Sequence, residues 1–297
     1  MKGKAYIGVD FGGTKILTGA VTKEGQILAE PVKKPTNGQE EKEKIFGRVI
    51  DSIEETREKL KDKNVEIAGI GMGVTGPIDI KEGVILECPQ LPTMHFFPLK
   101  KQIEEHFSLP VFMNNDANCL IYGEAIYGSG KGFNNMVGFT LGTGIGCAVI
   151  LNRKIHDGNT GSSGEIWPSP YKDGTIEDYV SGSGVSKIYK EIVGEEKFSY
   201  EIAVLAEKGN LNAIRTWNEF GKHLSVAISW SINLIDPEVI ILGGSIAEAF
   251  KFFSSAMETS LRKLICPVPA EKIKVVRAKL GSNAGLVGAA ALAIFNE

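Results

Sequence analysis

The chain contains 297 residues, and its 33 Lys and Arg against 36 Asp and Glu give a formal net charge of −3. Hydrophobic residues make up 43% and charged residues 23%, as in ordinary globular proteins, so a disordered chain is excluded. The slightly acidic balance argues against binding to nucleic acid or to an anionic membrane. The sequence contains no secretory signal and no membrane-spanning run of ~18 apolar residues, so we expect a cytoplasmic protein. The length of the chain predicts two domains.

The first half of the chain alternates predicted strands and helices. Apolar residues at 4–9 and 16–21 flank a glycine-rich turn at 10–15, which predicts a β-hairpin. Helical spacing of apolar residues among charged ones predicts an amphipathic helix at 40–63. The remaining predicted elements are strands at 26–32, 66–72 and 111–113 and helices at 98–107 and 117–127.

The second half begins like the first. A strand at 136–140, a glycine turn at 141–146 and a further strand repeat the opening hairpin about 130 residues later, which predicts two related halves. Helices are expected at 176–192, 200–208 and 212–234, a strand at 238–242, and a buried helix at 283–295. We place a small α/β domain at 1–116 together with the C-terminal helix, about 283–297, and a large α/β domain at 117–282.

Glycine is enriched, since 35 of 297 residues are about 12% against roughly 7% in average proteins. Two common phosphate-binding motifs are nevertheless excluded. The nearest match to a Walker loop, 125–132, has Ala125 at its first position and Gly132 at its last. The G-x-G-x-x-G pattern at 71–76 continues into a Pro-Ile-Asp sequence, where a dinucleotide site needs a helix.

The two hairpin turns, 10–15 and 141–146, remain as candidate phosphate-binding loops. Glycine lets backbone N–H groups approach phosphate oxygens, and nearby threonine hydroxyls and a lysine can add hydrogen bonds and charge. Asp10 is suited to holding Mg²⁺ through water. Either turn alone is better explained as an ordinary hairpin turn, but the two together, with Gly243-Gly244 after a third strand to approach a nucleoside, favour a nucleotide site. The residues assigned to the nucleotide are Asp10, Gly12, Gly13, Thr14, Lys15, Gly142, Thr143, Gly144, Gly243 and Gly244.

The ordered set of motifs resembles the ROK family, which includes bacterial glucokinases, fructokinases, N-acetylhexosamine kinases and sugar-responsive repressors. The resemblance covers essentially the whole chain. It implies a two-domain α/β fold of the actin-like ATPase (ribonuclease H-like) type, with a cleft between the domains for ATP and a sugar, and a homodimer. The motifs are Asp10-Phe11-Gly12-Gly13-Thr14-Lys15, Gly76-Pro77, Asn115-Asp116-Ala117-Asn118, Leu141-Gly142-Thr143-Gly144-Ile145-Gly146, and Asp236-Pro237 before Gly243-Gly244.

The same resemblance assigns the residues that act on the sugar. Asp116 follows an apolar strand, where a carboxylate could face a cleft, and the family uses this Asp as the general base. The preceding Asn115, together with Glu165, Glu177 and Gly76, corresponds to positions that orient the sugar. Other roles stay open, because an Asn or Asp before a helix is also a typical N-cap, and Glu177 is also placed as a first-turn helix acid.

The chain departs from the family where a structural zinc is usual. Trp167-Pro168 replaces the family's Gly-His, and the following segment contains no cysteine, so we expect no zinc site. We expect Trp167, Tyr171 and the prolines at 168 and 170 to order this segment, with Trp167 packed inside the loop rather than stacked on a sugar.

These observations predict an ATP-dependent carbohydrate kinase that uses Mg²⁺ and phosphorylates a hexose in the manner of a glucokinase. The alternatives are a kinase of another sugar or polyol, such as fructose, an N-acetylhexosamine or an inositol-like compound, and a non-catalytic module that binds sugar or ATP. A sugar-sensing repressor of the same family is disfavoured, because the first loop begins at Asp10 and leaves no room for a preceding DNA-binding segment.

Overall fold

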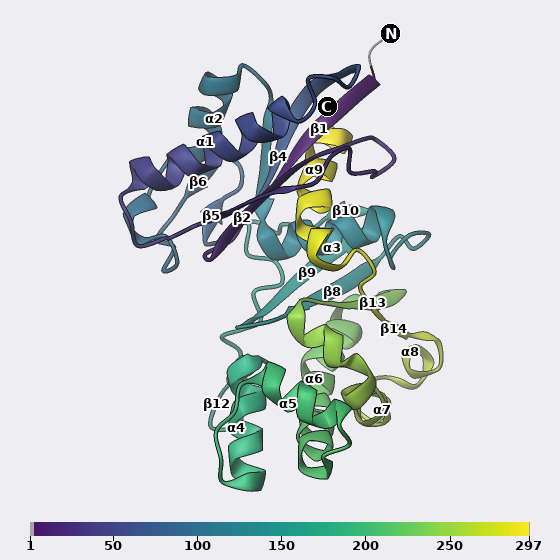
Figure 1. The fold of residues 1–297 in the computed structure, drawn as a ribbon. Helices are drawn as coiled ribbons and strands as arrows, with labels where there is room; N and C mark the ends of the chain where they lie inside the picture. The colour runs from purple at the N-terminus through teal and green to yellow at the C-terminus, as the bar shows by residue number, and fades with distance from the viewer. Residues whose placement is uncertain (1–2, 297) are drawn as a thin grey trace. The chain divides into compact units, whose positions relative to one another are not determined.

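The structure is a computed structural model and describes residues 3–296. Two compact units make up the fold, and each contains a five-stranded sheet (Figure 1). Unit 1 comprises the chain up to Lys131, residues Asp157–Ser162 and the chain from Ser282, whereas unit 2 comprises Gly132–His156 and Ser163–Gly281. None of the helices in residues 3–296 combines the length and the apolar composition that a membrane span requires.

The sheet of unit 1 has the order β3-β2-β1-β4-β7. β1 pairs antiparallel with β2 and parallel with β4, and β4 pairs parallel with β7. The strands are β1 (Gly3–Phe11), β2 (Lys15–Val21), β3 (Val32–Pro35), β4 (Val65–Val74) and β7 (Val111–Asn115), with a separate short pair β5 (Ile78–Asp79) and β6 (Val84–Ile85). The α-helices are α1 (Lys42–Glu58), α2 (Leu99–Phe107), α3 (Asp116–Tyr127) and α9 (Ala284–Asn296), and a short 3₁₀ helix, η1, spans Pro92–Met94.

The sheet of unit 2 has the order β10-β9-β8-β13-β14 and repeats the pairing directions of unit 1, which confirms the predicted duplication. Its strands are β8 (Met136–Leu141), β9 (Ile145–Leu151), β10 (Lys154–Ile155), β13 (Val239–Gly243) and β14 (Lys274–Arg277), with a short pair β11 (Pro170–Tyr171) and β12 (Gly174–Thr175). Its helices are α4 (Gly182–Val193), α5 (Ser199–Glu207), α6 (Leu211–Ile235), α7 (Phe250–Leu261) and α8 (Pro267–Lys272), and η2 is Ser245–Ala249; η3 (Gly281–Asn283) leads into α9.

The predicted elements differ from the structure mainly at two places. The third strand begins at Val32 rather than at 26, and residues 26–31 contribute only an isolated bridge from Ile27. The helix expected from 176 begins at Gly182, because the side chain of Ser181 accepts a hydrogen bond from the Gly184 N–H and caps the helix there.

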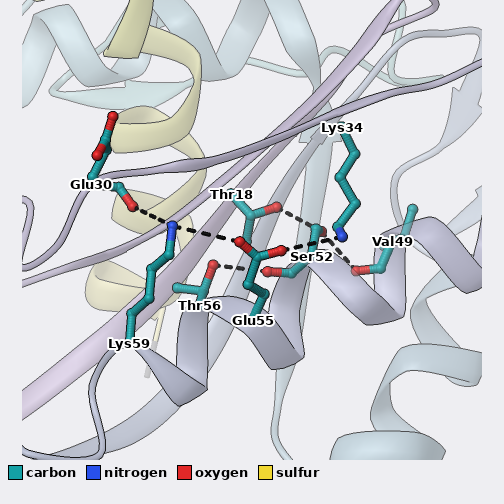
Figure 2. Close-up of polar contacts among 8 residues, drawn as sticks. All are labelled: Thr18, Glu30, Lys34, Val49, Ser52, Glu55, Thr56 and Lys59. Atoms are coloured by element: carbon teal, nitrogen blue, oxygen red, sulfur yellow. Dashed lines mark hydrogen bonds and ion pairs between the residues drawn. The ribbon is translucent and has the colours of Figure 1, made fainter.

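α1 is attached to the neighbouring strands by a buried polar contact (Figure 2). The hydroxyl oxygens of Thr18 on β2 and Ser52 on α1 lie 2.8 Å apart, and both side chains are fully buried. Ser52 donates its proton to the Val49 carbonyl, so Thr18 is the donor to Ser52. At the solvent side, Lys34 forms an ion pair of 3.2 Å with Glu55. Every buried hydroxyl of this contact is therefore hydrogen-bonded.

α9 packs against the opposite face of the unit 1 sheet and is buried from Ala284 to Ile294, as predicted. Side chains alternate along β1, so Ile7 enters the core with α1 while Gly8 faces α9. The approach of α9 depends on glycine. A Cβ on Gly71 would lie 1.7 Å from the Ala289 carbonyl oxygen, and a Cβ on Gly288 would lie 1.7 Å from the Cys119 carbonyl oxygen.

The boundary between the compact units falls at Lys131/Gly132, whereas the domain boundary expected from the sequence lies at 116/117. α3 belongs to unit 1 because it packs against α9 along its length, and α9 in turn contacts β1 and β4. Residues Asp157–Ser162 also belong to unit 1, although the chain on both sides of them belongs to unit 2.

Candidate active site

Three parallel strands of unit 1 end at one edge of the sheet. In the register, Asp10 on β1 pairs with Gly73 on β4, and Val74 pairs with Asn115 on β7. The predicted site residues therefore lie at or just beyond the ends of three neighbouring strands; they are Asp10, Gly76, Asn115 and Asp116. Ligands of open α/β sheets bind at such carboxyl ends, so this edge is the candidate site of unit 1.

The first glycine turn is held through its carbonyl groups. Thr36 donates from its N–H to the Thr14 carbonyl at 2.9 Å and from its hydroxyl to the Gly12 carbonyl at 2.7 Å. A Cβ on Gly13 would lie 2.8 Å from the Cβ of Gln90, so the turn packs against a neighbouring loop. The N–H groups of Gly13 and Thr14 take no part in the contacts with Thr36, which suits a turn that presents N–H donors to an anion.

Asp10 lies in a nearly buried position beside this turn. Its side chain is 16% exposed, and its Oδ2 lies 3.8 Å from the Lys15 ammonium. Burial raises the pKa of the Asp10 carboxyl, and the charge of Lys15 opposes that rise only in part. The start of α9 lies against the same carboxylate, since a Cβ on Gly285 would lie 2.8 Å from the Asp10 Cγ. Local sequence patterns do not predict this contact, because Asp10 and Gly285 lie so far apart in the chain.

A buried amide network supports the end of β7. The Asn114 Oδ1 accepts from the Asn115 N–H at 2.7 Å and from the Asn118 side-chain amide at 2.8 Å. The Asn114 Nδ2 donates to the Asp157 Oδ1 at 2.8 Å. These contacts fix the backbone at Asn115, and no local sequence pattern predicts them, since Asn114 lies on a strand and Asn118 on a helix.

Asn115 is the N-cap of α3, and Asp116 is the first residue of that helix. The Asn115 Oδ1 accepts from the Ala117 N–H at 2.9 Å, which settles the capping role that the sequence left open. The Asp116 Oδ1 accepts from the same N–H at 2.8 Å, and its residue is half-buried. Burial raises the pKa of the Cys119 thiol well above its usual range, and the Asp116 carboxylate adds to that rise. The amide of Asn115 lies close to Gly76, where a Cβ would come within 3.0 Å of its Nδ2.

The second glycine turn, between β8 and β9, is held by the segment that follows it in unit 2. The Gly142 N–H donates to the Gly144 carbonyl at 3.0 Å, and the Gly182 N–H donates to the Gly142 carbonyl at 2.8 Å. The Ile145 N–H donates to the Glu177 Oε2 at 3.1 Å. Thr143 is exposed at the tip, so its hydroxyl is accessible to a ligand.

Gly243 and Gly244 lie beside this second turn. Gly243 pairs with Thr140 at the ends of the parallel strands β13 and β8. Gly244 has a φ of +84°, and a Cβ there would lie 2.3 Å from the Leu141 carbonyl oxygen. Both the backbone conformation and the lack of space therefore require glycine at this position. The backbone after β13 can approach the turn closely only because that side chain is absent.

The two predicted sugar-binding glutamates lie next to β9. Glu177 precedes α4 by five residues, so its interpretation as a first-turn helix acid is wrong, and its carboxylate instead contacts the second glycine turn. Glu165 is exposed and follows Gly164, where a Cβ would lie 2.2 Å from the Cys147 carbonyl oxygen on β9. Burial raises the pKa of the Cys147 thiol to about 12, and the Glu165 charge adds to the rise. Both glutamates thus flank the same strand of unit 2.

The segment between the two glutamates corrects one further expectation. Trp167 is 46% exposed rather than packed inside its loop, and Tyr171 is the half-buried aromatic residue that packs against other rings. Within residues 3–296, no group of three or more His, Cys, Asp or Glu side chains is arranged to hold a metal ion.

The structure therefore brings the predicted residues together in two groups, one in each unit. The group in unit 1 is Asp10, Gly12, Gly13, Thr14, Lys15, Gly76, Asn115 and Asp116, and the group in unit 2 is Gly142, Thr143, Gly144, Glu165, Glu177, Gly243 and Gly244.

Two units with the same strand order, each carrying a glycine turn between its first two strands, define an α/β protein of the actin-like ATPase fold. The comparison with known proteins gives the family. The ROK family model matches residues 6–295, and the chain belongs to that family.

Several relatives match along nearly the whole chain. An uncharacterized protein of Clostridium perfringens is 33% identical and covers 95% of both chains. A glucokinase of Halalkalibacterium halodurans is 29% identical, with 97% of this chain and 94% of that protein covered. Among solved structures, a ROK family glucokinase from Streptomyces griseus in complex with glucose and AMPPNP superimposes with a TM-score of 0.82 at 28% identity, covering 97% of this chain and 98% of that one.

Proposed function

We propose that this chain is an ATP-dependent kinase that transfers the γ-phosphoryl group of Mg-ATP to a hydroxyl of a hexose such as glucose. The observation that carries the proposal is the shared sheet edge of unit 1, where the first glycine turn follows β1 and the Asn115–Asp116 pair follows β7, with the parallel strand β4 between them. This edge offers N–H donors for phosphate and a carboxylate for a hydroxyl proton. Family membership and full-length similarity to a glucokinase support the same activity.

Asp116 is the general base in this proposal. Its carboxylate accepts the proton of the sugar hydroxyl while the hydroxyl oxygen bonds to the γ-phosphorus and the bond to the β,γ-bridging oxygen breaks, so ADP leaves. The hydrogen bond from the Ala117 N–H holds one carboxylate oxygen, and the cap at Asn115 fixes the turn before it. Both contacts use the Ala117 N–H of α3, so the backbone at the start of this helix holds the base in place.

The two glycine turns are proposed to bind the phosphate groups, with Lys15 and the hydroxyls of Thr14 and Thr143 adding charge and hydrogen bonds. Gly243 and Gly244 allow a nucleoside to approach the strand end. The nearly buried Asp10 carboxylate is the hard oxygen donor that Mg²⁺ prefers, and an ion that keeps most of its waters needs few protein ligands. Bound Mg²⁺ would neutralise part of the phosphate charge.

Asn115, Glu165 and Glu177 are proposed to orient the sugar, because carboxylate and amide groups can bind adjacent hydroxyls, and Gly76 leaves room beside the Asn115 amide. We further propose that residues 1–116 with the C-terminal helix and residues 117–282 act as two domains that close on both substrates and exclude water, with α3 staying with the first domain because it packs against α9. The protein is proposed to be cytoplasmic and to work as a homodimer, the oligomeric state that the family resemblance implies.

A coupled ADP-release assay with Mg-ATP and a panel of hexoses, N-acetylhexosamines and polyols tests this proposal. We expect turnover with a hexose at a kcat on the order of 1–100 s⁻¹, well above the ADP release seen without sugar. Asp51→Asn, which changes an exposed carboxylate of α1, serves as a control and should keep full activity. Turnover confined to another sugar class would correct the substrate. If no sugar of the panel stimulates ADP release, the kinase proposal is overturned and a non-catalytic binding module remains.

A further inference from the structure

Residues 164–182, here called the linking segment, contact the second glycine turn at two points. The Glu177 Oε2 accepts from the Ile145 N–H at 3.1 Å, and the Gly182 N–H donates to the Gly142 carbonyl at 2.8 Å. The fit at the turn is close, because a Cβ on Gly144 would lie 2.3 Å from the Glu177 Oε2. The position of the linking segment therefore determines the shape of the turn.

The linking segment has little regular structure of its own. It contains the two-residue strands β11 and β12 and otherwise turns, and many of its residues are exposed. Fixing such a segment costs about 1–2 kcal/mol of backbone entropy for each ordered residue. Packing against another element must offset that cost if Glu177 is to keep its contact.

A cluster of three rings, Tyr171, Tyr179 and His223, supplies this packing and is here called the tyrosine–histidine cluster. The Tyr171 hydroxyl lies 2.9 Å from the His223 Nδ1. The ring centroids of Tyr171 and Tyr179 lie 5.2 Å apart with the planes at 89°, and those of Tyr179 and His223 lie 5.0 Å apart. An edge-to-face pair such as Tyr171–Tyr179 contributes about 0.5–1.5 kcal/mol beyond the area it buries. His223 lies on α6, so the cluster joins the linking segment to a long helix of unit 2.

Charged groups lie on the outer side of the cluster. The Lys187 ammonium lies 4.4 Å and the Lys172 ammonium 4.9 Å from the centroid of the Tyr179 ring, and the Tyr179 hydroxyl donates to the Asp173 carboxylate. Burial lowers the pKa of His223 to about 4, so its ring is neutral near pH 7 and its Nδ1 can accept the Tyr171 proton. The Tyr171 hydroxyl is therefore the donor and the neutral His223 ring the acceptor in this hydrogen bond.

We propose that Tyr171 is a positioning residue: through its hydrogen bond to His223 on α6 it holds the linking segment so that Glu177 fixes the second glycine turn for the nucleotide. The inference rests on the proposed function only for the nucleotide-binding role of the turn. The structural connection from Tyr171 through the linking segment to the turn does not depend on catalysis. It assigns to Tyr171 and His223 an effect on nucleotide binding although neither residue belongs to the proposed site.

Hydrogen–deuterium exchange of the peptide covering 142–146 tests the link without any need for activity. Tyr171→Phe removes the hydroxyl and keeps the ring, and we expect exchange about two- to tenfold faster, the effect of losing one net hydrogen bond. Glu177→Ala should give at least the same acceleration, whereas Glu177→Gln, which keeps an acceptor oxygen, should stay near the parent. Tyr200→Phe removes the hydroxyl of an exposed tyrosine and is the matched control.

Unchanged exchange at 142–146 in Tyr171→Phe would overturn the inference, and so would an equal acceleration across all of unit 2, which indicates general loss of stability. In the coupled ADP-release assay, we expect Tyr171→Phe to raise the KM for ATP several-fold relative to the unsubstituted protein, while kcat changes less than twofold. A parent protein without any kinase activity would overturn the proposed function, and the exchange result would still decide the positioning role.

Discussion

The Nδ2 of Asn114 lies 2.8 Å from the Oδ1 of Asp157, so the end of β7 is hydrogen-bonded to a residue that follows it by 43 positions. Asp157 begins the short segment of unit 1 that leads on to Glu165. The same Asn114 side chain holds the backbone of Asn115 and the amide of Asn118. One buried amide thus joins the strand before the proposed base to a segment from the other half of the chain.

Asn114→Ala should therefore destabilise the protein and misplace the start of α3. The side chain is 4% exposed, and its loss leaves buried polar partners unsatisfied, so we expect a loss of about 1–3 kcal/mol in the free energy of unfolding. Urea denaturation measures the change, with Asn64→Ala, an exposed loop residue, as the control. A loss below about 0.5 kcal/mol, the range of ordinary surface substitutions, would contradict the importance of this network.

Asp116→Asn should remove the proposed base and leave nucleotide binding intact. The amide cannot take up the hydroxyl proton, so we expect kcat to fall about 10²–10⁴-fold. The affinity for ATP, measured by calorimetry, should change less than threefold, because the phosphate contacts come from the glycine turns. Activity within tenfold of the parent would show that another group accepts the proton.

Gly144→Ala should weaken nucleotide binding more than it lowers stability. The new Cβ would lie 2.3 Å from the Glu177 Oε2, so the carboxylate must move and release the Ile145 N–H. We expect the KM for ATP to rise about tenfold, the effect of 1.4 kcal/mol. The matched control is Gly47→Ala on α1, where no atom lies within 4 Å of the added Cβ and where alanine should stabilise the helix by about 0.5–1 kcal/mol. Equal KM values in both variants would contradict the prediction.

Asp10→Asn should stabilise the ligand-free protein at pH 7 and abolish its response to Mg-ATP. Burial raises the pKa of the Asp10 carboxyl, so ionisation opposes folding as pH rises through the folded-state pKa, and the neutral amide avoids that penalty. Thermal unfolding followed from pH 7 down toward pH 4 should show the difference from the parent shrinking. Asp51→Asn provides a control for a carboxylate at the surface. Destabilisation at pH 7 would contradict the expected sign.

His223 should titrate with a pKa of about 4, and NMR can follow it because the chain has only four histidines. Burial is the main cause; Lys172, Lys222 and Lys187 lower the pKa further, and Glu219 opposes them. Because the unfolded chain takes up this proton at a higher pH, near 6.5, the neutral ring contributes stability above that value. That contribution should be lost as pH falls from about 6.5 toward 4 in the parent and be absent in His223→Gln. A measured pKa near 6.5 would contradict the prediction.

Local sequence patterns sufficed for the duplicated hairpins, the glycine turns, the cap region at Asn115 and the buried helix α9, because each depends on neighbouring residues. They did not suffice where a partner is distant. The sequence pattern places Glu177 on a helix, yet the cap at Ser181 makes α4 begin later. The N–H group that Glu177 binds belongs to Ile145, which lies 32 residues earlier. Likewise, the sequence predicts that Tyr171 orders its segment but does not reveal its partner His223, which follows 52 residues later on α6.

The position of α9 sets the order in which the chain can reach its native state during synthesis. Gly71 and Gly288 allow α9 to pack closely against β4 and α3, so the first-made sheet keeps one apolar face uncovered until residues 284–296 leave the ribosome. Domains usually fold from the N-terminus onward as they emerge. Here unit 2, made later, is complete first, and unit 1 has to wait for the last helix.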